Sequence, residues 1–474
     1  MESSTDAMTR STADDALAGK SAARGLGYTS DPFVTCMLGK SQGAMAKSLR
    51  KRQPLINRGY YARVEVIRNR FENFVRNLGE TQLQVVNLGV GFDTLSLDLL
   101  QQCQTSGRKM AIYEVDFIDV VKRKAEYILS DPLLRSPLFP NDDTSTNTSA
   151  NKASVFTQIN NNDVQNSGYH EHTRDLSSSS RISWSSTGNT VHGVIGSTNP
   201  LYLLGCDLRK AEDVTLALRA SGFDPTIPTA IISECTLVYI ESRYAFALCA
   251  ALGNLLDANT PAIWISYDMT HSQDTYGKVM LRNLTNAGFK VPSFTQLPTL
   301  ASHKLLFEEA GWGDPLSRKR GSSDPGVSNW TEPRLGRQLA PLAPMISKTL
   351  LPIMQVAEED SEADDDEKGK SIPSDQTLHE SANLVEIKPA LKEHGGMLMD
   401  MHSAPEVSRE ICHAFGAVET ITMLQAWERL ISSEEKTRVS KLELFDELEE
   451  WNMLMSHYCL TTAARNCIIF DSQR

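Results

Sequence analysis

Hydrophobic residues along this chain gather into short runs, and helical stretches separate the runs. Residues 84–90, 110–117, 201–208, 230–239 and 262–269 are continuously apolar rather than alternating, which predicts strands covered on both faces. Residues 94–103, 119–129, 213–222 and 241–256 have helical patterns between them. This succession predicts an α/β fold with a doubly wound, mostly parallel sheet, whose ligands bind at the carboxyl ends of the strands.

Two segments interrupt the pattern. In residues 141–200, 37 of 60 residues are Ser, Thr, Asn, Asp or Gly, which bury too little apolar surface to offset their ordering entropy. Residues 314–410 contain prolines and the acidic run 358–367. We expect both segments to be low-complexity surface insertions. The C-terminal part resumes with residues 416–431, a helix at 441–455 and a strand at 457–465, which would complete the sheet.

The predicted organisation follows from these boundaries. It comprises a polar N-terminal tail at 1–19, one domain in three parts (20–140, 201–313 and 411–474), and the insertions 141–200 and 314–410. No internal repeat is visible, which disfavours solenoids and propellers.

Charge and cysteine spacing exclude several classes of protein. The formal charge is −12, and the eight carboxylates of residues 358–367 account for most of it, so no basic stripe for nucleic acid is expected. No stretch approaches the ~20 apolar residues that cross a bilayer, and the N-terminus lacks a secretory signal. The cysteines form no CxxC pair, so neither disulfides nor structural zinc is expected. We therefore expect a soluble, reduced, cytoplasmic protein.

The strongest local motif is NLGVGFDT, residues 87–94, which follows a strand and opens a helix. Gly89 and Gly91 let the backbone turn tightly and approach a ligand without Cβ interference. Asp93 or Thr94 is placed to cap the helix. A dinucleotide fingerprint requires glycine at 94, so a dehydrogenase is disfavoured. The turn alone fits either a nucleoside ligand or merely a tight connection.

Acidic residues stand at the tips of three successive predicted strands. Asp116 ends the second strand, where an acid accepts hydrogen bonds from both hydroxyls of a ribose. Glu114 is an alternative ribose ligand, although Asp116 lies nearer the strand tip. Asp207 and Leu208 end the third strand and suit an adenine edge and face, and Glu234 ends the fourth strand, where it could hold an amino group. Together with the glycine turn, these acids predict a nucleoside site.

Several longer segments carry a resemblance to a known family. They are GYTSDPF (27–33), PLINRGYYARV (54–64), VVNLGVGFDT (85–94), YEVDF (113–117), GCDLRK (205–210), SECTLVYI (233–240), YGKVMLRNL (276–284), Gly311-Trp312 and HYCLTTA (457–463). With these segments the chain resembles the leucine carboxyl methyltransferases. Those enzymes use S-adenosyl-L-methionine to esterify the C-terminal leucine of the protein phosphatase 2A catalytic subunit. The combination of INRGYYARV, NLGVGFDT and SECTLVY makes the resemblance specific.

The resemblance implies a Rossmann-like class I methyltransferase fold with S-adenosyl-L-methionine as methyl donor. The cofactor-binding residues that it implies are Lys20 and Arg63, the latter for the methionine carboxylate, Gly89 beneath the cofactor, Asp116 for the ribose, Asp207 and Leu208 around the adenine, and Glu234 near the methionine end. The insertions 141–200 and 314–410 depart from the compact family pattern. Both fall between matching segments, so they bear on substrate access rather than on the cofactor site.

Methylation of a carboxylate needs few chemical groups. An α-carboxyl group, with a pKa of roughly 3.5, is already ionised at neutral pH, so no general base is required. Alignment of the carboxylate, methyl group and sulfur can contribute roughly 7–11 kcal/mol. Arg63 and Tyr239 are the candidate catalytic residues, as a cation and a hydroxyl that would position the acceptor. No cluster of His, Cys and carboxylate residues has ligand spacing, so no metal is expected.

The sequence leaves two other functions open. A tRNA-modifying carboxyl methyltransferase that acts on a wybutosine precursor shares the fold, but it carries a kelch-like repeat region and nothing here repeats. A non-catalytic phosphatase-binding protein would need neither the strand-tip acids nor the glycine turn. We expect a monomer whose partner is the phosphatase 2A catalytic subunit, with no nucleic-acid or membrane partner.

His457 and Cys459 are interpreted as core residues rather than catalytic ones.

Overall fold

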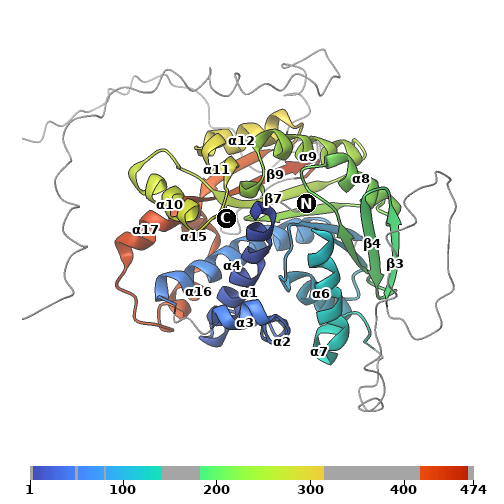
Figure 1. The fold of residues 1–474 in the computed structure, drawn as a ribbon, viewed down its shortest axis with the longest axis horizontal. Helices are drawn as coiled ribbons and strands as arrows, with labels where there is room; N and C mark the ends of the chain where they lie inside the picture. Colours follow the sequence, from blue (N-terminus) through green and yellow to red (C-terminus); the bar gives the residue numbers. More distant parts are fainter. Residues whose placement is uncertain (1–3, 49–51, 80–81, 141–181, 314–416, 468–474) are drawn as a thin grey trace, which may run out of the picture. The chain divides into compact units, whose positions relative to one another are not determined.

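A nine-stranded sheet organises the described part of the chain (Figure 1). The structure, a computed structural model, describes residues 4–48, 52–79, 82–140, 182–313 and 417–467. Its strands are β1 (Leu83–Leu88), β2 (Met110–Asp116), β3 (Ile182–Thr187), β4 (Thr190–Ile195), β5 (Leu201–Gly205), β6 (Thr229–Glu234), β7 (Ala262–Met269), β8 (Val418–Thr422) and β9 (Tyr458–Arg465). They lie in the order β3-β4-β5-β2-β1-β6-β7-β9-β8.

The centre of this sheet is parallel. Strands β5, β2, β1, β6 and β7 pair in parallel, whereas β9 runs antiparallel between β7 and β8. The strand order reverses at β1, because the chain builds outward to β5 on one side and returns to build β6 and β7 on the other. The predicted doubly wound, mostly parallel sheet and Rossmann-like class I fold are confirmed. Such a reversal leaves a crevice at the carboxyl ends of the neighbouring strands.

Helices cover both faces of the sheet. They are α1 (Ser4–Gly25), α2 (Phe33–Lys40), α3 (Gln42–Ser48), α4 (Pro54–Asn77), α5 (Leu95–Ser106), α6 (Ile118–Ser130), α7 (Pro132–Arg135), α8 (Ala211–Ala220), the 3₁₀ helix η1 (Leu237–Tyr239), α9 (Ser242–Leu255), α10 (Thr275–Asn286), α11 (Pro292–Gln296), α12 (Leu300–Glu309), α15 (Met423–Leu430), α16 (Ser433–Val439) and α17 (Leu448–Ser456). None of these described helices combines the length and apolarity needed to cross a membrane.

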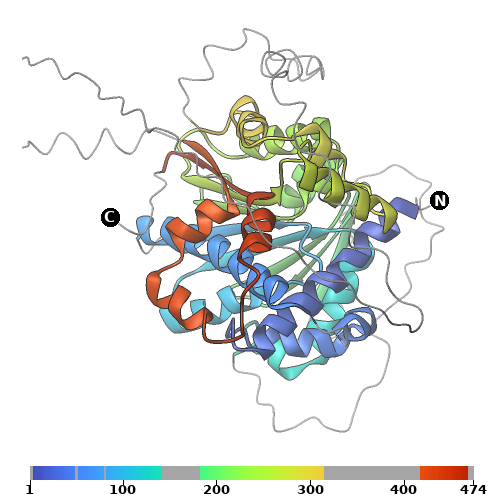
Figure 2. The same ribbon diagram turned by 90° about the vertical axis from the view of Figure 1, so that its left-hand side faces the viewer.

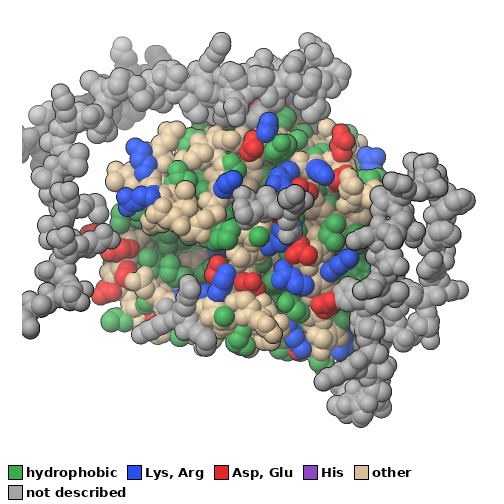
Figure 3. Space-filling model, viewed as in Figure 1, with side chains coloured by type: hydrophobic (Ala, Val, Ile, Leu, Met, Phe, Trp, Pro, Cys, Tyr) green, Lys and Arg blue, Asp and Glu red, His purple; other side chains and the backbone are tan. Residues whose placement is uncertain are grey.

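Alternate residues of each strand enter two different cores. Val85 and Ile112 pack with α4, α5 and α6 on one face, whereas Val86, Tyr113 and Trp264 pack with α8, α9 and α12 on the other. Both faces are therefore dry, which explains the continuous apolar runs in the sequence. On the outer face drawn in Figure 3, basic and acidic side chains are interspersed.

The prediction of a polar tail at 1–19 is wrong, because α1 occupies residues 4–25. Leu17 and Ala18 are fully buried, and Ala13 packs against the same core. The buried face of α1 consists mostly of alanines, so its Ser, Thr and Asp residues dominate the composition and conceal the helix. In Figure 2, α1 (dark blue) lies at one end of the strands beside α2 and α3.

The end of the insertion predicted at 141–200 also belongs to the sheet. Strands β3 and β4 form a hairpin, and β4 pairs with β5. Its tip is Gly188-Asn189, with Gly188 at a φ of +58°, a turn that requires a positive φ and therefore favours glycine. The composition of residues 141–200, taken as a whole, concealed this local turn signal. Residues 141–181 and the insertion predicted at 314–410 lie outside the described residues.

The C-terminal part completes the sheet as predicted, with β8 and β9 at its edge. The helix predicted at 441–455 is partly wrong, because α17 begins only at Leu448. His457 and Cys459 are 5% and 0% exposed, so their placement in the core is confirmed.

Candidate active site

A pocket of about 300 Å³ lies at the carboxyl ends of β1, β2, β5 and β6. Every site residue predicted from the sequence lines it, namely Lys20, Arg63, Gly89, Asp116, Asp207, Leu208, Glu234 and Tyr239. Helix α1 forms another wall, with residues from Asp6 to Lys20 along it. The crevice expected from the strand order is therefore a pocket that α1 bounds on one side.

The glycine turn after β1 is held by contacts from within the protein. Gly89 and Gly91 have φ angles of +62° and +53°, a conformation that favours glycine. A Cβ atom on Gly89 would lie 2.4 Å from Cγ2 of Thr236, and one on Gly91 would lie 2.8 Å from Cβ of Ala13. The sequence argument assigned both glycines to ligand approach. In the structure they also allow the turn to pack against α1 and the loop after β6.

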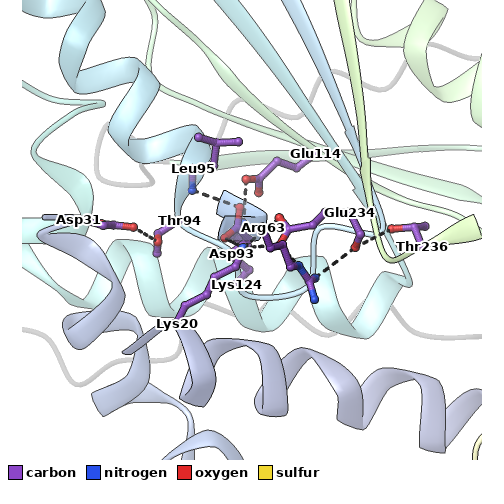
Figure 4. A network of polar contacts seen from close by, with 10 residues as sticks. All are labelled: Lys20, Asp31, Arg63, Asp93, Thr94, Leu95, Glu114, Lys124, Glu234 and Thr236. Carbon is purple, nitrogen blue, oxygen red and sulfur yellow. Dashed lines mark hydrogen bonds and ion pairs between the residues drawn. The ribbon is translucent and has the colours of Figure 1, made fainter. Parts of the chain in front are cut away.

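A network of charged side chains lies beside this turn (Figure 4). Lys20 Nζ is 2.6 Å from Asp93 Oδ1 and 2.8 Å from Glu234 Oε1. Arg63 Nε donates a hydrogen bond to the same Glu234 carboxylate. These four side chains, which we call the pocket network, are 11–15% exposed. Two cations therefore share Glu234 within a nearly buried site.

The ionisation of the pocket network follows from its pairing. Burial would lower the pKa of Lys20, but Asp93 and Glu234 outweigh burial and raise it. Burial would likewise raise the pKa of Asp93, yet Lys20 holds it down at about 2. Burial acts to lower the pKa of Arg63, but Glu234 and smaller contributions from nearby side chains together raise it well above its usual range. Lys20, Asp93 and Arg63 are consequently charged at neutral pH.

Asp116 stands at the tip of β2, as predicted for a ribose ligand. Its two oxygens accept the backbone N–H groups of Gly91 and Phe117, each at 2.7 Å. Burial raises its pKa to about 6 and outweighs these hydrogen bonds. The alternative, Glu114, does not line the pocket and is 0% exposed. Its carboxylate pairs with Lys124 at 2.7 Å, so Glu114 is committed elsewhere (Figure 4).

Asp207 has a partner that the sequence analysis missed. The backbone N–H and the guanidinium of Arg209 donate to its carboxylate at 2.8–3.0 Å. The same guanidinium is 3.0 Å from Asp6 of α1. Burial acts to raise the pKa of Asp207, but Arg209 outweighs it and leaves the pKa lowered. Arg209 thus connects the carboxyl end of β5 to the N-terminal helix α1, and Leu208 lines the pocket beside it.

Another part of the pocket wall is apolar. Met269, Leu284, Phe289, Tyr239 and Tyr458 line it. Burial raises the pKa of Tyr239 well above its usual range, so its hydroxyl keeps its proton at neutral pH. We call this region the apolar end.

Two other kinds of chemistry find little support at this site. Burial raises the pKa of the Cys235 thiol, which also lines the pocket, to about 12, so it is a poor nucleophile. Among the described residues, no group of three His, Cys, Asp or Glu side chains could hold a metal ion. The pocket therefore offers positioning groups rather than a nucleophile or a metal centre.

Several lining residues escaped the sequence analysis. Tyr60, Phe117 and Tyr458 are examples, and each lies inside or beside a motif that the analysis had quoted. Apart from Lys20, most lining residues of α1 had no such signal, because their side chains are small or polar. Only the packing of α1 across the strand ends brings them to the pocket.

Comparisons with known proteins agree with this geometry. Residues 8–253 match the family described as Leucine carboxyl methyltransferase. Leucine carboxyl methyltransferase 1 of Aspergillus fumigatus is 25% identical over 98% of this chain and 86% of its own length. The Bos taurus protein of the same name is 26% identical over 64% and 74%. tRNA wybutosine-synthesizing protein 4 of Homo sapiens is 27% identical over 64% of this chain but only 36% of its own length.

The family match covers more than half of the chain and includes the glycine turn and the tips of β1, β2, β5 and β6. The chain therefore belongs to the leucine carboxyl methyltransferase family, which consists of S-adenosyl-L-methionine-dependent carboxyl methyltransferases.

Proposed function

We propose that this protein methylates the α-carboxylate of the C-terminal leucine of the protein phosphatase 2A catalytic subunit. The observation that carries the proposal is the pocket itself. Part of its wall holds two cations and the strand-tip acids, and another part is apolar. Such a pocket suits a charged, nucleoside-containing donor on one side and an aliphatic side chain on the other. The names of the relatives from Aspergillus fumigatus and Bos taurus support a leucine carboxylate as acceptor.

The residues present fit S-adenosyl-L-methionine. Arg63 and Lys20 would hold its methionine carboxylate, because both are cations whose partner, Glu234, is shared. Glu234 would hold its amino group. Asp116 would accept hydrogen bonds from the ribose hydroxyls, and Gly89 lies beneath the cofactor in this assignment. When bound, the cofactor supplies a methyl group on a positively charged sulfur.

The adenine would lie between α1 and the carboxyl end of β5. Asp207 would meet its polar edge and Leu208 its face, which places the ring next to the Arg209–Asp6 ion pair. Because Arg209 joins Asp207 to α1, the adenine end would be covered by the N-terminal helix.

The acceptor needs orientation rather than activation. A C-terminal carboxylate, with a pKa of roughly 3.5, is ionised at neutral pH. Tyr239 retains its hydroxyl proton and would donate to one carboxylate oxygen, while Arg63 would attract the acceptor's negative charge. The apolar end excludes water from the acceptor, which strengthens these contacts.

The direct test follows the transferred methyl group. Methyl-labelled S-adenosyl-L-methionine would be mixed with the phosphatase catalytic subunit, either intact or lacking its last leucine. We expect base-labile label on the intact subunit alone. Arg63→Ala should abolish labelling, whereas Arg243→Ala, which removes a 58% exposed arginine, should not. Cofactor binding without label on either form of the subunit would contradict the proposed acceptor.

A second candidate acceptor is a carboxyl group on tRNA, because the human wybutosine-synthesizing relative is similar over 64% of this chain. The charge of −12 and the interspersed charges on the face in Figure 3 favour the protein acceptor, since RNA binding normally needs a basic surface. Labelling of total tRNA in the same assay decides between them. The other function left open by the sequence, a non-catalytic phosphatase-binding protein, is disfavoured, because the family to which the chain belongs consists of methyltransferases.

A further inference from the structure

His457 is a buried titratable residue that the proposed mechanism does not use. It follows α17 and precedes Tyr458, which lines the apolar end of the pocket. The residue is 5% exposed. Its backbone N–H donates to Leu454, and its carbonyl accepts the N–H of Thr270 at 2.9 Å. The backbone thus joins α17 to the loop that leaves β7.

Both ring nitrogens of His457 face acceptors. Nδ1 is 2.7 Å from the carbonyl oxygen of Met453, and Nε2 is 2.8 Å and 2.9 Å from the two carboxylate oxygens of Asp274. A carbonyl oxygen and a carboxylate oxygen can only accept a hydrogen bond. Both nitrogens must therefore donate, and the ring that satisfies this geometry is an imidazolium.

Asp274 connects this ring to α10. It is the N-cap of that helix, and its Oδ1 accepts the N–H of Gly277 at 2.7 Å. Burial acts to raise its pKa, but the hydrogen bonds from Gly277 and His457 outweigh burial and lower the pKa. The carboxylate is thus ionised, caps α10 and contacts His457 at the same time.

The helix that Asp274 caps forms part of the apolar end. Leu284 lies on α10 and Phe289 follows it, and both line the pocket together with Tyr458. The His457–Asp274 ion pair therefore joins the two segments, α10 and the start of β9, that supply this wall. Loss of the pair would let α10 move relative to β9.

We infer that His457, held as an imidazolium between Asp274 and the Met453 carbonyl, is a positioning residue that sets the apolar wall for the acceptor. The inference deepens the proposed function and rests on it, because the acceptor's aliphatic side chain is what this wall would meet. His457 acts through Leu284, Phe289 and Tyr458 and does not itself line the pocket.

The groups around the ring determine how the pair responds to pH. Besides Asp274, the titratable groups that face His457 are His271, with ring centroids 6.0 Å apart, and Tyr276, at 4.5 Å. Burial, and then the His457 charge, lower the pKa of His271, so that ring is neutral. Burial raises the pKa of Tyr276, so it is neutral too. Of the titratable groups that face the ring, Asp274 is therefore the one that carries a charge.

Three variants test the inference. His457→Phe keeps a ring and removes both hydrogen bonds. Asp274→Asn keeps the helix cap, because asparagine also caps well, but removes the charge. Thr299→Ala is the matched control, because it removes the N-cap of α12, a helix that does not line the pocket.

We expect His457→Phe to raise the KM for a leucine-ended tail peptide ~10-fold, with kcat and cofactor affinity changed less than about twofold. Asp274→Asn should raise KM about threefold. Thr299→Ala should leave KM unchanged. An unchanged KM in His457→Phe, or an equal rise in Thr299→Ala, would overturn the inference.

Two further measurements need no acceptor. Nitrogen-15 spectra at neutral pH should show both ring nitrogens of His457 protonated, and amide exchange in α10 should be faster in His457→Phe than in Thr299→Ala. If the wild type fails to methylate the tail, the proposed function fails, while these two measurements still decide the role of His457. A single protonated nitrogen, or unchanged exchange in α10, overturns that role.

Discussion

Two groups of buried charges lie side by side in this fold, and they differ in how they are paired (Figure 4). Lys124 and Glu114 form a one-to-one pair at 2.7 Å in which both side chains are 0% exposed. In the pocket network, two cations contact two carboxylates and have one of these carboxylates in common. This network lines a pocket of about 300 Å³. We call the first group the sealed pair.

The difference teaches which charges can take a new partner. In the sealed pair, the two charges contact each other and have no access to solvent, so removal of either leaves the other without its ion-pair partner. In the pocket network, Glu234 contacts both Lys20 and Arg63, so either cation can turn to an incoming carboxylate while Glu234 keeps the other. The sealed pair should therefore matter for stability and the pocket network for binding.

The largest predicted effect is on the sealed pair. Lys124→Met should lower the free energy of unfolding by ~3–5 kcal/mol, because it leaves Glu114 charged and dry. The double variant Glu114→Leu/Lys124→Met should recover most of that loss. Urea denaturation without cofactor measures both. A loss under about 1 kcal/mol in the single variant would contradict the predicted role of the sealed pair.

The second prediction concerns the pocket network, where the expected loss is in activity rather than in stability. Arg63→Ala should lower kcat/KM by at least ~100-fold, or about 2.7 kcal/mol, while the free energy of unfolding changes by less than about 1 kcal/mol. Stability is spared because Glu234 retains Lys20. Methyl-transfer kinetics and urea denaturation on one preparation check both statements, with Arg243→Ala as the matched surface control. A large loss of stability with intact activity would reverse the comparison.

Much of the pocket could be predicted from the sequence, because parallel strands bring their carboxyl ends to one edge. Asp116 and Glu234 lie far apart in the chain, yet each ends a continuous apolar run, and that position alone brings them together. The glycine turn added a conformational signal at Gly89. Regular strand geometry thus predicts where a strand-end residue lies, even when the side chains that it contacts are unknown.

The pairings themselves could not be predicted. Lys20 meets Glu234 across 214 positions, and Arg209 meets Asp6 across 203, through side-chain packing that no local pattern encodes. The small buried face of α1 gave no periodic apolar signal, and the hairpin β3–β4 was concealed by its polar surroundings. Packing of α1 over the strand ends, rather than its composition, makes it part of the site.

The third prediction concerns Asp116, a carboxylate that belongs to neither group. Asp116 has a pKa of about 6, raised by burial, and only its ionised form accepts hydrogen bonds from two ribose hydroxyls. Cofactor affinity should therefore rise as pH increases through about 6 and then level off. Asp116→Asn should bind the cofactor ~10-fold more weakly near pH 7.5 and lose that rise. Calorimetric titrations from about pH 5 to about pH 8 test this, and a wild-type affinity independent of pH would refute the assignment.

The last prediction, whose expected effect on activity is the smallest, concerns a buried carboxyl group that avoids charge instead of pairing it. Asp268, which is 2% exposed, accepts the N–H of Val238 at 3.1 Å, and burial raises its pKa to about 8. Between pH about 4 and about 8 the folded protein therefore holds a proton that the unfolded chain releases, so stability falls as pH rises.

Asp268→Asn should remove this contribution and flatten the fall in unfolding free energy by ~1 kcal/mol per pH unit across that window. Because asparagine still accepts from Val238, the loop that carries Tyr239 should keep its position and kcat should change little. Parallel slopes for the wild type and the variant would mean that Asp268 is ionised in the fold. It would then have to draw on Arg63, and the pocket network would contain a third carboxylate competing for the cation that the acceptor requires.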